Sequence, residues 1–247
     1  MRGRRAAVLA ATLLVTLVGG SLTAAAGTGP TGTGSPADGP DDGLAAITQS
    51  PYSDIGPADR FFYDVLWMTD RGIATGWPDG TFRPTAPVTR EAAAAFLYRW
   101  GLGGSIPACT GSSRIFTDVT AGNPFCGAIE FLAERLIVNG FPDGTFRPSE
   151  PISREAFVTI LLRGTGQSLV SCTSTTREFT DVTSGNPFCP YIETASDLGI
   201  VNGWSDGTFR PGLTIERQAI AAMLHRADVL RPTAPADLAG TIWADEG

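Results

Sequence analysis

A nine-residue pattern that occurs three times constrains this chain more than any other feature. The copies are GWPDGTFRP at 76–84, GFPDGTFRP at 140–148 and GWSDGTFRP at 203–211. Their first glycines are 64 and 63 residues apart, so the copies mark one unit that is repeated at a nearly constant period. The rest of the chain is therefore best interpreted as three versions of one structural unit.

Each copy contains an Asp-Gly pair, which predicts a turn, because Asp bonds to nearby backbone and Gly tolerates positive φ. The pairs are Asp79-Gly80, Asp143-Gly144 and Asp206-Gly207. The Thr-Phe-Arg-Pro that follows predicts an extended exit, and its phenylalanine (Phe82, Phe146, Phe209) is expected to pack beneath the turn. The aromatic residue after the first glycine (Trp77, Phe141, Trp204) either packs against a neighbouring helix or is exposed for a ligand.

Two helices are predicted in each repeat. The first follows an aromatic, a hydroxyl residue and Asp (Tyr52-Ser53-Asp54, Phe116-Thr117-Asp118, Phe179-Thr180-Asp181) and has amphipathic spacing over 59–72, 125–136 and 188–199. The second follows the turn, from Val88, Ile152 and Ile215, and is apolar on nearly every side. A helix without a polar face is buried, so we expect the three second helices to form a central bundle.

The helix starts differ among the repeats. Thr89 and Ser153 are good N-caps, and Glu91 and Glu155 follow where the helix dipole favours an anion. Repeat three has Glu216 at the cap position and Gln218 in place of the glutamate, so its helix start is expected to be weaker or shifted to Thr214. Repeat one has Gly56-Pro57 near the place where the others carry Asn123-Pro124 and Asn186-Pro187.

The N-terminal segment has the features of an export signal. Residues 1–26 contain three arginines, an apolar run and an Ala-Ala-Ala cleavage site, whereas retention as a membrane anchor is the alternative. A Gly/Pro/Thr-rich linker is expected at 27–49. The repeats are expected at 50–101, 114–164 and 177–227, and a short C-terminal tail at 228–247.

Four cysteines occupy corresponding places in repeats two and three. Cys109 and Cys126 are 17 residues apart, as are Cys172 and Cys189, and this duplicated spacing predicts those two disulfides. Export makes oxidation plausible. Zinc binding is the competing interpretation, which the absence of histidine from both segments disfavours.

Charge and composition exclude several function classes. All 18 basic residues are arginine and the formal net charge is −7, which argues against a nucleic-acid partner. The single histidine, His225, lies at the end of a predicted buried helix and is expected to be a satisfied structural residue rather than a catalytic base. Motifs for a cofactor, a metal or a bound phosphate are missing from the sequence. We therefore expect a protein that is not an enzyme; a cell-wall hydrolase has the least support.

Taken together, these motifs resemble those of the S-layer homology (SLH) family. The resemblance rests on a unit of the form FTDV, helix, GIVNGWSDGTFRP and ITREA, and it covers about residues 50–227. It implies an all-α fold in which three helix–loop–helix repeats surround a central three-helix bundle with pseudo-threefold symmetry. It also implies grooves between the repeats that bind secondary cell-wall polysaccharide, often through a pyruvylated amino sugar.

The family's binding positions can be carried over to this sequence. They are the arginine at the start of each second helix, Arg90, Arg154 and Arg217, and the Asp-Gly turns at Asp79, Asp143 and Asp206. An arginine can hold a carboxylate with two parallel hydrogen bonds, and Trp77 and Trp204 could stack on a sugar. The turn arginines Arg83, Arg147 and Arg210 add a second cationic position. The alternatives are a structural Arg–Glu ion pair at the helix start and a purely structural turn.

These expectations define a secreted protein of the cell wall or cell surface that anchors noncovalently to wall polysaccharide or to a peptidoglycan-linked glycan. Surface proteins are further expected partners, and membrane contact is not expected after signal cleavage. The alternative is a structural surface protein whose repeats mainly mediate assembly with other proteins. The two functions differ in whether removing the helix-start arginines abolishes wall binding while the fold is retained.

Overall fold

The computed structural model describes residues 49–109, 114–173 and 177–230, all of which belong to the unit Asp41–Gly247. The predicted signal peptide, nearly all of the predicted linker and residues 231–247 of the predicted tail lie outside the described residues. The helices are α1 (Phe62–Asp70), α2 (Arg90–Leu102), α3 (Cys126–Glu134), α4 (Arg154–Thr165), α5 (Cys189–Asp197), α6 (Arg217–Ala227) and the 3₁₀ helix η2 (Asp228–Leu230). The all-α class is confirmed for the described part of the chain, which has isolated β-bridges but no sheet.

The first helix of each repeat is shorter than its amphipathic pattern predicted. Each begins after a phenylalanine N-cap, Phe61, Phe125 or Phe188, which makes no side-chain capping bond. Each ends just before a residue in the left-handed region, namely Gly72 (φ 65°), Leu136 (φ 57°) or Gly199 (φ 70°). A residue with positive φ cannot continue a right-handed helix, so the apolar residues that follow pack beneath the turn instead.

The second helix of each repeat begins two residues later than the apolar pattern, at an arginine. The Thr89 and Ser153 hydroxyls accept hydrogen bonds from the backbone N–H groups of Ala92 and Ala156, so both predicted N-caps are confirmed. In repeat three Glu216 is the N-cap and makes no side-chain capping bond. The predicted shift of this start to Thr214 is wrong, because Thr214 is extended and forms a β-bridge with Ser153.

Three backbone hydrogen bonds join the repeats in a closed cycle immediately before the second helices. The Val88 N–H donates to the Ile215 carbonyl at 3.1 Å, the Ile152 N–H donates to the Val88 carbonyl at 2.9 Å, and the Ile215 N–H donates to the Ile152 carbonyl at 3.1 Å. Each repeat thus gives one bond and receives one. Because the residues that form it are extended, the helices cannot start before this cycle.

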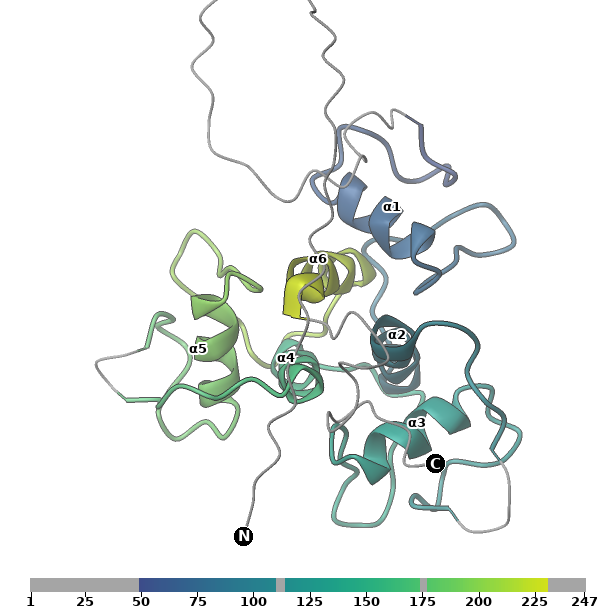
Figure 1. Cartoon of the computed structure of the whole chain (residues 1–247). Helices are drawn as coiled ribbons and strands as arrows, with labels where there is room; N and C mark the ends of the chain where they lie inside the picture. The colour runs from purple at the N-terminus through teal and green to yellow at the C-terminus, as the bar shows by residue number, and fades with distance from the viewer. Residues whose placement is uncertain (1–48, 110–113, 174–176, 231–247) are drawn as a thin grey trace, which may run out of the picture. The chain divides into compact units, whose positions relative to one another are not determined.

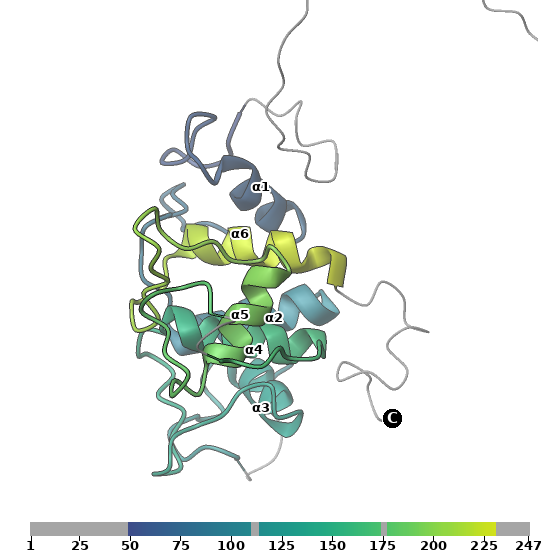
Figure 2. The same ribbon diagram turned by 90° about the vertical axis from the view of Figure 1, so that its left-hand side faces the viewer.

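The first helix of each repeat packs on the second helix of the preceding repeat. Thus α3 packs on α2, α5 packs on α4, and α1 returns to pack on α6. Figure 1 shows α2, α4 and α6 at the centre with α1, α3 and α5 outside them, and Figure 2 shows α1 beside α6 at one end of the molecule and α3 at the other. Equivalent contacts therefore follow one another around the cycle, whereas the pseudo-threefold symmetry itself stays a prediction.

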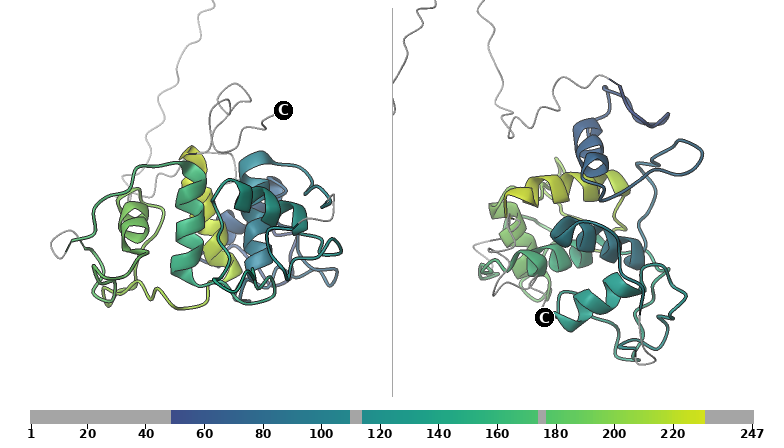
Figure 3. Two further views of the ribbon diagram at one scale, coloured as in Figure 1. Left: turned by 90° about the horizontal axis from the view of Figure 1, so that it is seen from below. Right: turned by 45° about the vertical axis from the view of Figure 1, so that its right-hand side comes forward.

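The second helices supply much of the core, as their apolar sequences predicted. In α2, Ala93 to Tyr98 are buried in succession, and Phe157 to Leu162 are buried in α4. Figure 3 shows α4 and α6 running alongside each other. Phe82, Phe146 and Phe209 are each 2% exposed or less, so the predicted packing of these residues beneath the turns is confirmed.

The two predicted disulfides are present and tie the inter-repeat segments to helix starts. Cys109 bonds to Cys126 at the first residue of α3, and Cys172 bonds to Cys189 at the first residue of α5. The competing zinc interpretation is wrong, because all four sulfurs are used in the disulfides. None of the described helices is long and apolar enough to span a membrane.

Candidate ligand-binding grooves between repeats

The Asp-Gly turn is held by its own aspartate. In repeat one, Asp79 Oδ1 accepts from the Thr81 backbone N–H at 3.1 Å and from its hydroxyl at 2.6 Å, and Oδ2 pairs with Arg83 at 2.9 Å. Asp143 and Asp206 make the same bonds in their repeats. Hydrogen bonds from Thr and Arg favour the charged carboxylate and lower the pKa of all three aspartates to about 2. The three predicted ligand-binding aspartates therefore have a structural use.

The turn arginines occupy a backbone conformation that is unusual for any residue except glycine. Arg83, Arg147 and Arg210 have φ between 57° and 59°. In repeat one the Asp54 carboxylate accepts from the backbone N–H groups of Phe82 at 2.7 Å and Arg83 at 2.8 Å, and this clamp fixes the strained residue. Asp118 and Asp181 make the same clamp. The sequence had shown these acids only as part of the repeat opening.

The helix-start arginines reach across to the next repeat. Arg90 donates from Nε to the Phe146 carbonyl at 2.7 Å and from Nη2 to the Asn139 carbonyl at 3.0 Å. Arg154 bonds in the same way to Phe209 and Asn202, and Arg217 to Phe82 and Thr75. Each arginine thus links the second helix of one repeat to the turn of the next.

Burial sets the electrostatics of these arginines. Arg154 and Arg217 are only 7% exposed, and desolvation lowers the pKa of each guanidinium to about 10. Desolvation also lowers the pKa of the half-buried Arg90. At neutral pH all three remain cationic, and their bonds go to carbonyl oxygens rather than to the neighbouring glutamate. The predicted Arg–Glu ion pair is therefore not the arrangement found.

The aromatic residue of each turn lies against two guanidinium groups. The Arg217 and Arg83 guanidinium carbons are 4.3 and 4.6 Å from the centre of the Trp77 ring. Arg90 and Arg147 approach Phe141 in the same way, and Arg154 and Arg210 approach Trp204. All three rings are partly buried, so each both packs against the protein and keeps part of its surface exposed.

The glutamates after the helix-start arginines bond to an asparagine of the next repeat. Asn123 donates from Nδ2 to Glu91 at 2.7 Å, and Asn186 donates to Glu155 at 3.0 Å. Repeat one has Asp59 at the corresponding place. The Asp59 carbonyl accepts from the N–H of Phe62, the first residue of α1, just as the Asn123 and Asn186 carbonyls accept from the first residues of α3 and α5. At the 64-residue period Asp59-Arg60, next to Gly56-Pro57 in the chain, are thus the counterparts of Asn123-Pro124.

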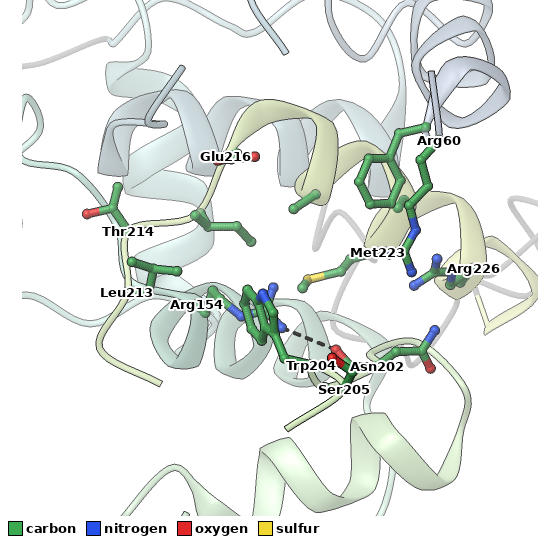
Figure 4. A pocket seen from close by; sticks show the side chains of 15 residues that line it. Arg60, Arg154, Asn202, Trp204, Ser205, Leu213, Thr214, Glu216, Met223 and Arg226 are labelled. Atoms are coloured by element: carbon green, nitrogen blue, oxygen red, sulfur yellow. Dashed lines mark hydrogen bonds between the residues drawn. The ribbon is translucent and has the colours of Figure 1, made fainter. Parts of the chain in front are cut away.

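One groove lies where repeat three meets repeat one. It has a volume of about 560 Å³, and its walls come from the repeat-three turn, the start of α4, the segment before α6, α6 itself and Arg60-Phe61. Arg154 and Trp204 are the predicted site residues that line it, and Figure 4 shows Arg154 bonded to the backbone of Asn202. Arg210 and Asp206 are on the same turn but do not line the groove.

Sequence reasoning missed two arginines of this groove, Arg60 and Arg226. A signal for Arg226 was present, because Arg99 and Arg163 occupy the same place in α2 and α4. Arg226 donates to the Ile200 carbonyl at 3.2 Å, as Arg99 donates to Ile73. Pro124 and Pro187 take the place of Arg60 in the other repeats, so no repeated arginine indicated it.

A comparison with known families agrees with this architecture. The model of the S-layer homology domain matches residues 51–94, 115–158 and 178–221, which together exceed half of the chain. The protein belongs to the S-layer homology domain family. Each match begins near the opening of a repeat and ends within a second helix, so the three domains coincide with the structural units described above.

Several curated proteins are similar to these S-layer homology domains. Cell surface glycoprotein 1 of Acetivibrio thermocellus is 33% identical over 165 residues, which cover 64% of this chain and 7% of that protein. The cellulosome-anchoring protein of the same organism is 31% identical over 155 residues, covering 62% and 34%. An amylopullulanase of Thermoanaerobacterium thermosulfurigenes is 33% identical over 122 residues, covering 48% and 6%. The chain thus spans only a small part of these larger relatives.

Proposed function

We propose that this protein is a non-catalytic module that anchors noncovalently to the bacterial cell wall by binding secondary cell-wall polysaccharide in a groove between its S-layer homology domains. The observation that carries the proposal is the groove between repeats three and one, where Trp204 and Arg154 lie together. An indole face can stack on a sugar ring, and a guanidinium can hold a carboxylate such as that of a pyruvyl ketal. The names of two relatives, a cell surface glycoprotein and a cellulosome-anchoring protein, support a location at the cell surface.

The helix-start arginines have a double role in this proposal. Arg90, Arg154 and Arg217 each use Nε and Nη2 to bond to carbonyls of the next repeat. In the proposal the same guanidinium groups also supply positive charge to the ligand. Replacing these arginines with alanine would therefore disturb the repeat contacts as well as binding, and the test needs other residues.

The turn arginines provide a second test, because they are more exposed and Arg210 contacts Trp204 of the groove. Each also pairs with its turn aspartate, so thermal unfolding of the variant checks the fold. Arg83, Arg147 and Arg210 would be changed together to glutamine, and binding of residues 27–247 to sacculi of the source bacterium would be measured by sedimentation. The matched control changes Arg114, Arg135 and Arg177 to glutamine, which removes the same charge elsewhere on the chain. Sacculi with and without acid-extracted polysaccharide would be compared for each protein.

Anchoring through wall polysaccharide predicts binding that needs the polymer, is weakened about tenfold or more by the turn variant, and is retained by the control. Binding that survives extraction of the polymer would contradict the polysaccharide as ligand. A folded wild-type protein that binds neither preparation would favour the second candidate, a surface protein that assembles with other proteins.

A further inference from the structure

The three contacts between repeats are not alike at one position. The residue that precedes the phenylalanine N-cap is Arg60 before α1, Pro124 before α3 and Pro187 before α5. The groove that uses Arg60 is the one between repeats three and one, since α1 packs on α6. Of the three repeat contacts, this one alone therefore has an arginine before its first helix.

Three guanidinium groups line this groove, those of Arg60, Arg154 and Arg226. Figure 4 shows the side chains of Arg60 and Arg226 turned toward the same end of the groove. Arg154 and Arg226 each donate to backbone carbonyls, which do not neutralise their charge. Arg60 is exposed, lies 5.3 Å from the centre of the Phe61 ring and forms no ion pair with the described residues.

The groove has a single carboxylate among its lining residues, that of Glu216. This carboxylate accepts a hydrogen bond from Gln218 at 2.7 Å, at the start of α6. Three cations and one anion leave an excess of positive charge in a protein whose formal net charge is −7. Like charges held close together repel one another, and a bound anion offsets that repulsion.

The remaining surface of the groove suits a sugar. Ala219, Ala222 and Met223 of α6 provide an apolar surface, beside the partly buried Trp204, whose ring also contacts Arg154 and Arg210. A pyranose ring can lie against such surfaces while its charged substituent reaches the guanidinium groups. A neutral sugar would leave the excess charge without a partner.

We infer that the groove between repeats three and one is the principal site for a sugar that carries a carboxylate, and that Arg60 is the residue that gives this groove its selectivity. The inference rests on the proposed function and narrows it to one groove. The other two repeat contacts, which have proline in place of Arg60, contribute less to binding of a charged sugar. The arginine fork holds a carboxylate with two parallel bonds, whereas lysine would offer only a point charge.

The test compares Arg60→Gln and Arg60→Lys with wild-type protein in binding to intact sacculi. Arg135→Gln is the charge-matched control, because Arg135 lies at the end of α3 and does not line the groove. Thermal unfolding of each variant checks the fold, which exposed Arg60 should not affect. Sodium glucuronate is the competitor, and glucose with the same concentration of sodium chloride is its neutral control.

We expect Arg60→Gln to weaken binding about tenfold, Arg60→Lys to restore part of the loss, and Arg135→Gln to have no effect. Glucuronate should displace wild-type protein more effectively than glucose, and this difference should shrink in Arg60→Gln. If wild-type protein binds the polymer and Arg60→Gln binds equally well, the inference is overturned while the proposed function stands. If wild-type protein does not bind intact sacculi, both fail.

Discussion

Two of the three repeat contacts join segments that are consecutive in the chain, whereas the contact between repeats three and one joins residues up to 161 positions apart. The consecutive contacts are reinforced by disulfides at Cys126 and Cys189 and by Glu–Asn hydrogen bonds. The closing contact has neither. It has instead the pair of His225 Nδ1 with Asp64 Oδ1 at 2.9 Å and the pair of Arg71 with Asp228 at 3.2 Å.

The closing contact also keeps what all three contacts share. Arg217 bonds to repeat one as Arg90 and Arg154 bond to repeats two and three, and the cycle of backbone bonds includes Val88 and Ile215. The His225 ring stacks on Trp67 with centroids 4.7 Å apart, where the corresponding pair in repeats one and two is Tyr98 with Phe131. The contacts that all three junctions share thus build the fold. The side-chain pairs that differ stabilise each junction in its own way, whether the two repeats are consecutive in the chain or not.

The largest effect is expected from the disulfides, which act only on the consecutive contacts. Replacing Cys109, Cys126, Cys172 and Cys189 with alanine should cost about 3 kcal/mol for each bridge, because each closes a loop of similar length to the 15-residue reference. Urea unfolding followed by circular dichroism measures the loss. Equal stability of the variant and the oxidised parent would show that the inter-repeat segments need no covalent link.

The next effect concerns the arginine that the closing contact shares with the others. Arg217→Ala leaves the buried carbonyl of Phe82 and the part-buried carbonyl of Thr75 without their donor and should cost about 2–4 kcal/mol. Arg154→Ala should cost about as much, and the more exposed Arg90 should cost less. Chemical unfolding of the three variants ranks them. A much smaller loss of stability for Arg217→Ala than for Arg154→Ala would mean that the contact between repeats three and one is weaker than the consecutive contacts.

The hydrogen bond between His225 and Asp64 in the closing contact should have a moderate effect. His225→Leu introduces the residue that repeat two has at this place, Leu162, and should cost about 1 kcal/mol through loss of the bond to Asp64. A double-mutant cycle with Asp64→Asn isolates the coupling between the two side chains. The exposed Asp70→Asn serves as a control for charge on the same helix. Strict additivity would show that the pair contributes nothing.

A smaller gain is expected from giving the closing contact the pair that the others have. The double change Asp59→Asn with Gln218→Glu supplies an amide donor and a carboxylate acceptor like those of Asn123 and Glu91. It should raise the free energy of unfolding by about 0.5–1 kcal/mol. Gln218→Glu alone removes the hydrogen bond to Glu216 and adds a carboxylate without an amide partner, so it should bring no gain. The comparison is made by thermal unfolding. A gain from the single change that equals that of the double change would refute the pairing.

The turn aspartates make the same bonds in all three repeats. Replacing them should therefore change stability by nearly the same amount in each repeat, which is the smallest difference that we expect. Their folded-state pKa of about 2 lies below the ordinary value of 3.8, so their contribution to stability is present above pH 4. It should be lost as the pH falls through about 2. Asp79→Asn, Asp143→Asn and Asp206→Asn should therefore reduce this acid dependence equally, which melting at pH 6 and pH 2.5 measures. Unequal effects would show that the turns are not equivalent.

Much of the local structure could be predicted because short-range chemistry determines it. Thr89 and Ser153 cap their helices, the phenylalanines pack beneath the Asp-Gly turns, and the cysteines pair at their duplicated spacing. Helix lengths were overestimated, because Leu136 adopts a positive φ that amphipathic spacing does not reveal. The ligand-binding roles predicted for the arginines, tryptophans and turn aspartates remain proposals.

The sequence by itself determined the three repeats, their helices and turns, and the two disulfides, since each follows from residues close together in the chain. Only the tertiary structure decided which repeat each arginine contacts and that Arg60 joins Arg154 and Arg226 in one groove. The physical reason is that α1 must cover the apolar surface of α6 at the far end of the chain. Contacts made by that closure join side chains whose proximity no local pattern encodes.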